Sequence, residues 1–305
     1  MKFPLSKYIW FDGKLVPVNM AKVPVTTHAI HYGTSIFEGI RAYWNSKNLH
    51  VFRLKDHVKR FRNSGKFYNI KLNFSDRQIE NAVIDLCKKN KIKKSCYIRP
   101  FYFVGQYGIN FHVTQKAPTH TAIFAFPFGD LFNKSGITAT ISKWRKFSDM
   151  STPTQAKMGG NYLNSILATQ DAKQRGFDEA ILLDQSGNVS EAPGENIFLV
   201  KNNMLVTPSL SSSALDGITR RSIITLAKDM KLKIKTQKVS KKELKMADEI
   251  FLSGTAAEIT PVIKIDKKKI GEGKVGNITK LFMDTYSDIV MNKSENYSHW
   301  LTVVY

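Results

Sequence analysis

The chain has 305 residues, of which 42% are hydrophobic and 23% are charged, so its composition is that of a folded globular protein and not of a disordered one. This length predicts two domains of moderate size. Lys and Arg outnumber Asp and Glu by 46 to 25, which gives a formal charge of +21. A positive charge of this size is compatible with binding to nucleic acid, to an anionic membrane or to acidic metabolites, and it does not distinguish among these partners. We interpret the lysine runs at 88–94, 231–238 and 265–270 as a lysine-rich solvated surface.

Neither a leader nor a metal site is indicated by the sequence. The first residues lack the apolar run of a signal peptide, and no segment reaches the roughly 18 apolar residues of a membrane span. We therefore expect a cytoplasmic chain without a membrane partner. Cys87 and Cys96 have no zinc-type spacing, so we expect both to be reduced and no metal to be bound.

The N-terminal half predicts a sheet accompanied by helices. The expected elements are a strand hairpin at 8–18, helices at 52–68 and 79–89, and strands at 96–105 and 121–129. The hairpin should turn at Asp12-Gly13, a pair that two-residue turns favour. Ser75 and Gln78 have the spacing of a capping box ahead of the second helix.

The C-terminal half also mixes strands and helices. The expected elements are a strand at 137–144, a helix at 161–176, a hairpin at 178–200 turning at 185–188, a helix at 219–230, a strand at 249–262 that ends in a tight turn, and a helix at 279–291. We therefore predict two α+β domains, an N-terminal one at 1–131 and a larger C-terminal one at 137–305, joined by a linker at 132–136.

Two short motifs point to no chemistry. GEGKVG at 271–276 matches the dinucleotide pattern GxGxxG, but too little chain follows it for a nucleotide-binding domain, so we interpret it as a turn. His28 and His31 lack the intervening Glu of a zinc-binding helix and a third ligand nearby, so they are expected to be ordinary core or surface histidines.

Lys157 is the first candidate for catalysis. It lies among small residues just before the helix expected to open near Asn161. The positive end of a helix dipole and burial both disfavour an ammonium ion, and a lysine must lose its proton to form a Schiff base. From the residues alone, an ordinary loop lysine remains the alternative.

Three other segments could bind anions or a cofactor. The amides that follow Gly217 open a helix and can face a phosphate. Residues 254–257 could form a nest of backbone donors, and Glu191 lies in a turn at the head of a strand. Ordinary helix caps and turns have the same sequence pattern, so none of these segments by itself establishes a binding site.

Six sequence segments, taken together and in order, favour a functional interpretation of these residues. They are HYGTSIFEGIR, YIRP, AKMGGNY, SEAPGENIF, SSALDGITR and SGTAAEITPV. Together they resemble the branched-chain amino acid aminotransferase family of fold-type IV pyridoxal-phosphate enzymes, over roughly residues 7 to 285. The resemblance implies a fold like that of D-amino acid aminotransferase, with a small N-terminal and a larger C-terminal α+β domain and pyridoxal 5'-phosphate between them. It also implies a homodimer or homohexamer.

The resemblance implies cofactor roles for particular residues. Lys157 would hold pyridoxal phosphate as a Schiff base and carry the proton, Glu191 would face the pyridine nitrogen, and Tyr162 would bond the ring oxygen. The phosphate would be held by Arg60, Gly217, Ile218, Thr219 and Thr255.

Substrate roles follow in the same way. The α-carboxylate would be bound by Tyr97, Thr255, Ala256 and Ala257, and the second carboxylate of glutamate by Arg99 and Tyr32. The apolar pocket would be lined by Phe37, Gly39, Tyr32, Tyr162 and Phe128, with Ile109 and Phe111 arriving from the neighbouring subunit. The sequence departs from the family where a Trp and a Tyr are expected, at Phe128 and Leu131, and at Asp216, where proline commonly precedes the glycine.

The predicted reaction is ping-pong transamination between leucine, isoleucine or valine and 2-oxoglutarate. Its partners would be amino acids and 2-oxo acids, with no specific nucleic acid. D-amino acid aminotransferase and aminodeoxychorismate lyase would share Lys157 and Glu191, whereas the EGIR and YIRP segments favour the branched-chain group. A basic nucleic-acid-binding protein is the alternative from another class, and the chain lacks a recognition motif for it.

Overall fold

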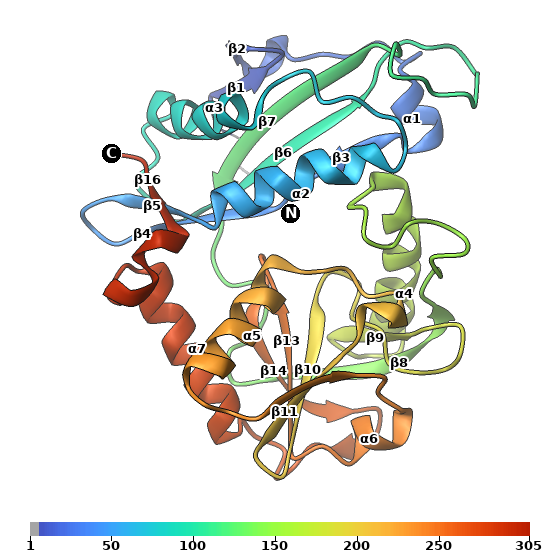
Figure 1. Cartoon of the computed structure of the whole chain (residues 1–305), viewed down its shortest axis with the longest axis vertical. Coiled ribbons are helices and arrows are strands. Elements are labelled where there is room, and N and C mark those ends of the chain that lie inside the picture. Colours follow the sequence, from blue (N-terminus) through green and yellow to red (C-terminus); the bar gives the residue numbers. More distant parts are fainter. Residues whose placement is uncertain (1–5) are drawn as a thin grey trace. The chain divides into compact units, whose positions relative to one another are not determined.

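Residues 6–305 are described by a computed structural model and form two compact units (Figure 1). Unit 1 comprises residues 6–129, 156–160 and 288–305, and unit 2 comprises residues 130–155 and 161–287. Over residues 6–305, no helix combines the length and apolar character that crossing a membrane requires.

Unit 1 is built on an antiparallel sheet whose strands run in the order β16-β5-β4-β6-β7-β1-β2, with β3 paired to β6. Its strands are β1 (Tyr8–Phe11), β2 (Lys14–Pro17), β3 (Ser35–Phe37), β4 (Ile40–Trp44), β5 (Leu49–Phe52), β6 (Cys96–Val104), β7 (Thr119–Pro127) and β16 (Leu301–Val303). Its helices are α1 (His28–Tyr32), α2 (Leu54–Lys66) and α3 (Asp76–Lys89), with the 3-10 turns η1 (Val18–Met20) and η4 (Glu295–Trp300).

Local sequence signals explain how these elements begin and end. Asp12 and Gly13 both take positive φ, 44° and 90°, as a two-residue hairpin turn requires, so the predicted hairpin is confirmed. The capping box is confirmed as well, because Ser75 Oγ accepts the Gln78 N–H while the Gln78 side chain accepts the Ser75 N–H.

The core of unit 1 lies between its sheet and the helices α2 and α3. Val58 and Phe61 of α2 and Val83 of α3 are buried in one cluster with Ile98 and Ile123 of the sheet. The helical spacing of these apolar positions therefore directs one face of each helix against the strands.

Unit 2 contains a second sheet, in the order β12-β11-β10-β13-β14-β8-β9, with β15 paired to β14. Its strands are β8 (Ile137–Arg145), β9 (Glu179–Leu183), β10 (Asn196–Lys201), β11 (Met204–Pro208), β12 (Ile234–Gln237), β13 (Glu249–Gly254), β14 (Glu258–Ile265) and β15 (Lys268–Lys269). Its helices are α4 (Tyr162–Gln174), α5 (Ile218–Asp229), α6 (Lys241–Lys245) and most of α7 (Asn277–Val290), with the 3-10 turns η2 (Gly159–Asn161), which begins in unit 1, and η3 (Leu210–Ser212).

Helices pack against this second sheet, and Figure 1 shows α5 and α7 beside its central strands. The rings of Phe198 (β10) and Phe251 (β13) stack at 5.1 Å, and Phe282 of α7 packs against Phe251 at 5.8 Å. Leu244 of α6 belongs to a separate buried cluster that includes Leu252 of β13. Large apolar side chains therefore lie on both faces of β13, because successive strand residues point to opposite sides.

The hairpin predicted for 178–200 is wrong in its second strand. The turn itself forms, since Asp184 N–H donates to the Asn188 carbonyl and Leu183 bridges to Val189. Ser190 and Glu191 still bond to Leu182 of β9, but beyond residue 191 the chain leaves β9, and β10 pairs with β11 and β13 instead. The partners of β10 lie later in the sequence, so the pattern of 178–200 alone did not reveal them.

The contacts assign two segments differently from the sequence-based domain limits. Residues 156–160 lie with unit 1 because they run beside β3, and residues 288–305 do so because β16 pairs with β5. The limits 1–131, 132–136 and 137–305 stay a prediction.

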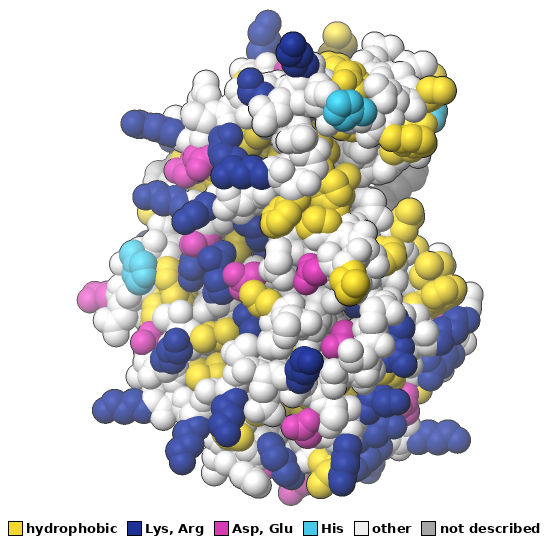
Figure 2. Space-filling model, turned by 45° about the vertical axis from the view of Figure 1, so that its right-hand side comes forward, with side chains coloured by type: hydrophobic (Ala, Val, Ile, Leu, Met, Phe, Trp, Pro, Cys, Tyr) yellow, Lys and Arg dark blue, Asp and Glu magenta, His cyan; other side chains and the backbone are white. Residues whose placement is uncertain are grey.

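The surface carries the lysines predicted to lie in solvent. All lysines of the runs 88–94, 231–238 and 267–269 are exposed. Figure 2 shows Lys and Arg side chains spread over one face of the molecule, with fewer acidic side chains among them. The GEGKVG segment forms a turn, as predicted, in which Gly271 and Gly273 take positive φ.

Candidate functional site

Lys157 of unit 1 is fixed through its backbone on two sides. Its carbonyl accepts the Phe37 N–H at 3.2 Å, and its N–H donates to Ser64 Oγ at 3.0 Å. Residue 158 also forms a bridge to Ile36 of β3. The segment 156–160 therefore lies along the edge of the sheet in a defined register.

The glycines of the AKMGG segment permit this close approach. A Cβ on Gly33 would lie 2.8 Å from the Cα of Gly160, and a Cβ on Gly159 would lie 2.2 Å from Ser35 Oγ. The Gly160 N–H donates to the Gly33 carbonyl at 3.1 Å. Small residues near Lys157 therefore serve to bring its backbone against the loop before β3.

The amine of Lys157 lies among cations and aromatic rings. Its Nζ lies 4.9 Å from the centre of the Phe37 ring, and the guanidinium carbon of Arg99 lies 4.5 Å from the same ring. Burial and the nearby Arg60 lower the pKa of Lys157 from 10.5 to about 8, although Glu38 opposes the shift. A useful fraction of this amine is therefore neutral near neutral pH, as a nucleophilic lysine requires.

Arg99 and Tyr97 form a polar pair beside that amine. The Arg99 Nη2 donates to the Tyr97 hydroxyl at 3.0 Å, whereas the Arg99 Nε is buried with no hydrogen-bond partner among the described residues. A buried guanidinium N–H without a partner is costly. This donor is therefore available to an anionic ligand, as the predicted second-carboxylate site requires.

Gly39 makes room for Tyr97. A Cβ at residue 39 would lie 1.9 Å from the Tyr97 hydroxyl oxygen, so any other residue would displace that phenol. Gly39 was predicted to line the apolar pocket, and its contact with Tyr97 places it next to the predicted carboxylate group.

A buried acid holds Arg60, the predicted phosphate ligand. Glu38 receives the Arg60 Nε at 2.7 Å on one oxygen and the Arg60 Nη2 at 2.8 Å on the other, and His57 Nδ1 donates to Glu38 at 2.8 Å. Burial raises the pKa of Glu38, but Arg60 and His57 lower it by more, so the pKa lies well below its usual range. Burial lowers the pKa of His57, so a neutral imidazole donates from Nδ1 to an ionised Glu38.

Glu191 of unit 2 is likewise fixed by several partners. Its Oε1 lies 2.6 Å from Lys146 Nζ, and its Oε2 accepts from the Leu215 N–H at 2.9 Å and from Asn196 Nδ2 at 3.2 Å. The carboxylate is almost fully buried. Burial lowers the pKa of Lys146, but Glu191 raises it by more, so the ammonium form is retained.

The first turn of α5 has the geometry of an anion site. Gly217 is its N-cap residue, and Ile218 and Thr219 open the helix with amides that have no partner within it. A Cβ on Gly217 would lie 2.0 Å from Asn196 Oδ1, so only glycine fits beside that side chain. Asn196 therefore contacts both Glu191 and the start of α5.

Asp216, which departs from the family pattern, also has a structural explanation. Its carboxylate lies 3.6 Å from Arg220 and 3.9 Å from Arg221, so its charge is balanced locally. Its N–H, which a proline would lack, donates to Gln155 Oε1 at 3.1 Å, and Gln155 Nε2 donates to the Ala214 carbonyl at 2.7 Å. The side chain of Gln155 therefore fixes the loop that precedes α5.

The turn from residue 255 to residue 257 joins β13 to β14. Gly254 pairs with Glu258 across this hairpin, and Thr260 Oγ1 donates to the Ala257 carbonyl at 2.8 Å. Glu258 takes a positive φ of 54°, which reverses the chain after Ala257. The predicted donors Thr255, Ala256 and Ala257 thus lie together at the end of a hairpin.

The remaining predicted residues divide between the units. In unit 1, the Phe128 ring lies 5.5 Å from Tyr97, and the Phe111 ring lies 5.2 Å from Tyr32 of the same chain. Ile109 and Phe111 are exposed by 82% and 81%, which leaves them accessible to another molecule. In unit 2, Tyr162 begins α4 and is partly buried, and Leu131 is 45% exposed.

Sequence reasoning missed several residues that support the candidate site. They are Glu38, His57, Lys146, Gln155 and Asn196. Glu38 and Asn196 lie inside the motifs FEGIR and GENIF, so they could have been considered from their place in the sequence. The other three gave no signal, because each acts through a contact with a residue distant in the chain.

Comparisons with known proteins show which family the chain resembles. A family model described as amino-transferase class IV matches residues 35–265. The branched-chain-amino-acid aminotransferases of Salmonella typhimurium and Escherichia coli K12 are each 42% identical over 98% of this chain and 98% of their own length. A probable branched-chain-amino-acid aminotransferase of Aquifex aeolicus is 40% identical over 98% of this chain and 97% of its own.

Solved structures of similar proteins give the same fold. The crystal structure of the Escherichia coli branched-chain amino acid aminotransferase has a TM-score of 0.95 at 42% identity and covers 98% of this chain and 100% of its own. The enzyme from Thermobaculum terrenum in its PLP-form has a TM-score of 0.93 at 33% identity and covers 99% of both chains. The predicted fold class, a two-domain α+β fold of type IV, is confirmed.

Proposed function

Because the chain belongs to the class IV aminotransferase family, we propose that it exchanges amino groups between leucine, isoleucine or valine and 2-oxoglutarate. The observation that carries this proposal is the Lys157 amine, whose lowered pKa and neighbours Arg99 and Tyr97 suit reaction with an anionic amino acid. A ping-pong order of substrates is part of the proposal.

The cofactor of this enzyme class is pyridoxal 5'-phosphate. When bound, it supplies an electron sink for the substrate carbon that loses its proton. The donor set suits it, because the chain provides a lysine amine with a lowered pKa, a buried carboxylate for a ring nitrogen and a helix N-terminus for a phosphate. These residues suit three polar groups of the cofactor, namely its aldehyde, its ring nitrogen and its phosphate.

In unit 1, Lys157 and Arg60 would act on the cofactor. Lys157 would hold it covalently, and its Nζ, once free, would take the proton from the substrate Cα. Arg60 would bind the phosphate, with its orientation set by Glu38 through two hydrogen bonds. This orientation is retained at acidic pH, because Arg60 keeps the pKa of Glu38 low.

In unit 2, Glu191 would keep the ring nitrogen protonated. Its charge is preserved by Lys146, and its position is set by Asn196 and the Leu215 N–H. The amides of Ile218 and Thr219 would donate hydrogen bonds to the phosphate, and Thr255 would also bind it. Tyr162 would donate a hydrogen bond to the ring oxygen.

Substrate selection would depend on a carboxylate site and an apolar surface in the same pocket. Arg99 would bind only a substrate with a second carboxylate, because leucine presents none. Phe37, Gly39 and Phe128 would contact an aliphatic side chain. The α-carboxylate, common to both substrates, would lie at Tyr97 and the amides of Ala256 and Ala257.

Assembly of several copies is part of the proposal. Leu163, Ile166 and Leu167 of α4 share one helical face and are exposed by 66%, 51% and 40%. A patch of this kind suits contact with a second copy of the chain. A homodimer or homohexamer in the cytoplasm, acting on amino acids and 2-oxo acids, thus stays our prediction.

A coupled assay tests the proposed reaction. Purified protein supplied with pyridoxal phosphate, L-leucine and 2-oxoglutarate should form glutamate and the branched 2-oxo acid in equal amounts. D-leucine and aminodeoxychorismate should give no product. Turnover of either in place of L-leucine would overturn the substrate assignment and leave the fold-type IV chemistry intact.

A further inference from the structure

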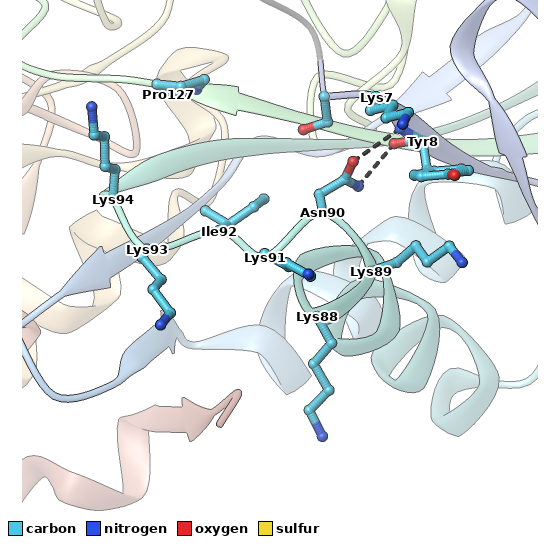
Figure 3. A pocket seen from close by; sticks show the side chains of 11 residues that line it. Lys7, Tyr8, Lys88, Lys89, Asn90, Lys91, Ile92, Lys93, Lys94 and Pro127 are labelled. Atoms are coloured by element: carbon cyan, nitrogen blue, oxygen red, sulfur yellow. Dashed lines mark hydrogen bonds between the residues drawn. The ribbon is translucent and has the colours of Figure 1, made fainter.

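A surface hollow in unit 1 is lined by lysines and by no acidic residue among those described. Its volume is about 930 Å³, and its lysines come from the residue before β1, the end of α3 and the segment that follows α3 (Figure 3). We call them the lysine cluster, and they are Lys7, Lys88, Lys89, Lys91, Lys93 and Lys94. None has a role in the aminotransferase reaction proposed above.

The backbone beneath the lysine cluster is held in place. Asn90 Oδ1 accepts the Tyr8 N–H at 2.9 Å, and Asn90 Nδ2 donates to the Tyr8 carbonyl at 3.0 Å and to the Leu86 carbonyl at 2.9 Å. The end of α3 is therefore tied to the strand next to Lys7. These bonds hold the backbone next to Lys7 and Lys89, and the Lys91 N–H donates to the Lys88 carbonyl at 3.0 Å.

The lysine cluster is not paired with acidic side chains at contact distance. None of its six lysines forms an ion pair with a residue in the described range 6–305. The lysine run 267–269 in unit 2 also forms no ion pair in this range, although it follows Asp266, whose carboxylate lies 3.2 Å from Lys245 and 3.8 Å from Arg175. The chain thus contains a second exposed lysine run, outside the hollow, that can serve as a control.

The directions of the side chains restrict the partner. Figure 3 shows Lys94 pointing away from Lys88 and Lys93, so the ammonium groups do not converge on one small anion. A flexible chain with repeated negative charges can reach groups that point in different directions.

An aromatic ring lies within the lysine cluster. The Tyr8 ring has Lys89 Nζ at 4.8 Å and Lys7 Nζ at 5.8 Å from its centre, and the residue is only partly buried. Bases of a single strand stack on such rings while lysines contact the phosphates. This ring favours a single-stranded nucleic acid over a chain of phosphates alone.

We propose that the lysine cluster binds the phosphodiester backbone of single-stranded nucleic acid, weakly and without sequence preference. The interaction is electrostatic, so it weakens steeply with added salt, because the release of counterions then contributes less free energy. This binding is independent of the transamination reaction. The proposal assigns it to the lysine cluster, whereas net charge alone would predict binding over the whole surface.

Two triple variants with equal loss of charge test the proposal. One carries Lys91→Gln, Lys93→Gln and Lys94→Gln, and the matched control carries Lys267→Gln, Lys268→Gln and Lys269→Gln. Binding of a labelled single-stranded oligothymidylate is followed by fluorescence anisotropy from about 20 to 150 mM salt. Thermal unfolding and aminotransferase activity of both variants should match those of the wild-type protein.

The first variant should lose about tenfold or more in affinity at low salt, and the slope of log affinity against log salt should fall by about two. The control should change by less than about threefold. Equal losses in the two variants would show that net charge alone drives binding and would overturn the proposal. Tighter binding of anionic vesicles than of the oligonucleotide, reduced by the same three changes, would overturn the choice of partner.

Discussion

Lys146 and Glu191 form a buried ion pair, with Nζ and Oε1 2.6 Å apart and side chains exposed by only 15% and 6%. The other carboxylate oxygen is bonded to Asn196 and to the backbone that leads into α5. The residue proposed to face the cofactor ring thus has its charge and position set by three partners.

Replacing Lys146 by Met should destabilise the fold. A buried Glu191 would lose its cation, and removing one member of such a pair typically costs about 3 kcal/mol. The pKa of Lys146 is raised above its ordinary value of 10.5, because the attraction of Glu191 outweighs burial. The ion pair should therefore contribute fully to the free energy of unfolding below pH 10.5, and this contribution should be lost as the pH rises through the raised pKa. Urea unfolding of Lys146→Met and Lys146→Arg at pH 7 measures the effect, and equal stability of wild type and Lys146→Met would contradict it.

The amine of Lys157 should react with pyridoxal phosphate in a pH-dependent manner. With a pKa of about 8, the rate of cofactor incorporation into cofactor-depleted protein should rise about tenfold per pH unit and level off above pH 8. Absorbance at each pH gives the rate. Borohydride reduction and peptide mapping should place the pyridoxyl group on Lys157, with none in Lys157→Ala. A rate that still rises at pH 10 would show that the pKa of Lys157 is not lowered.

Arg99→Ala should impair glutamate and 2-oxoglutarate more than leucine. Only the dicarboxylates offer a second anion, and a charge-assisted hydrogen bond contributes about 1.5 to 3 kcal/mol, or about ten- to a hundredfold in kcat/KM. Single-turnover kinetics of each half-reaction, followed through the cofactor absorbance, separates the two substrates.

Tyr97→Phe is the contrasting variant for this experiment. Tyr97 is proposed to bind the α-carboxylate, which both substrates share, so its loss should affect both half-reactions. If Arg99→Ala also affects leucine and glutamate equally, Arg99 acts on the common carboxylate or on the fold, and the two carboxylate sites were assigned incorrectly.

Glu38→Gln should weaken cofactor binding through Arg60. Glu38 holds two nitrogens of Arg60 and is fully buried, so the neutral amide would lose one oriented acceptor oxygen. We expect roughly tenfold weaker binding of pyridoxal phosphate, the effect of about one charge-assisted hydrogen bond. Fluorescence titration of cofactor-depleted protein measures the affinity.

Asp76→Asn is the matched control, because Arg62 in the same helix α2 bonds Asp76 through Nε at 2.5 Å. Asp76 is 47% exposed, so this pair contributes little. The control should keep the wild-type cofactor affinity. Equal losses in both variants would mean that damage to α2 explains the effect of Glu38→Gln.

The local parts of the fold were predictable and the distant pairings were not. Asp12-Gly13 and the Ser75–Gln78 box determine backbone conformation within a few residues, so both could be identified from the sequence. One partner of β10, the strand β13, lies about fifty positions later, which no local pattern contains. Strand pairing of this kind is settled by tertiary packing.

The candidate site shows the same division. Lys157 and Glu191 lie in the motifs, whereas Arg60 was predicted only from the family resemblance, and the roles of all three stay predictions. Lys146 and Gln155 were missed because their importance lies in side-chain bonds to residues 191, 214 and 216. Asp216 was a departure without a reason in the sequence, and its bonds to Gln155 and Arg220 supply one.

The pairing of β16 (Leu301–Val303) with β5 (Leu49–Phe52) has a consequence for synthesis of the chain. Strand β5 leaves the ribosome long before its outer partner has been made. Until then one edge of β5 has no neighbour, and such an edge can pair with other chains. The sheet of unit 1 is therefore completed only after residues 301–303 have been made, and a chain truncated before residue 301 should aggregate more readily than one that contains β16.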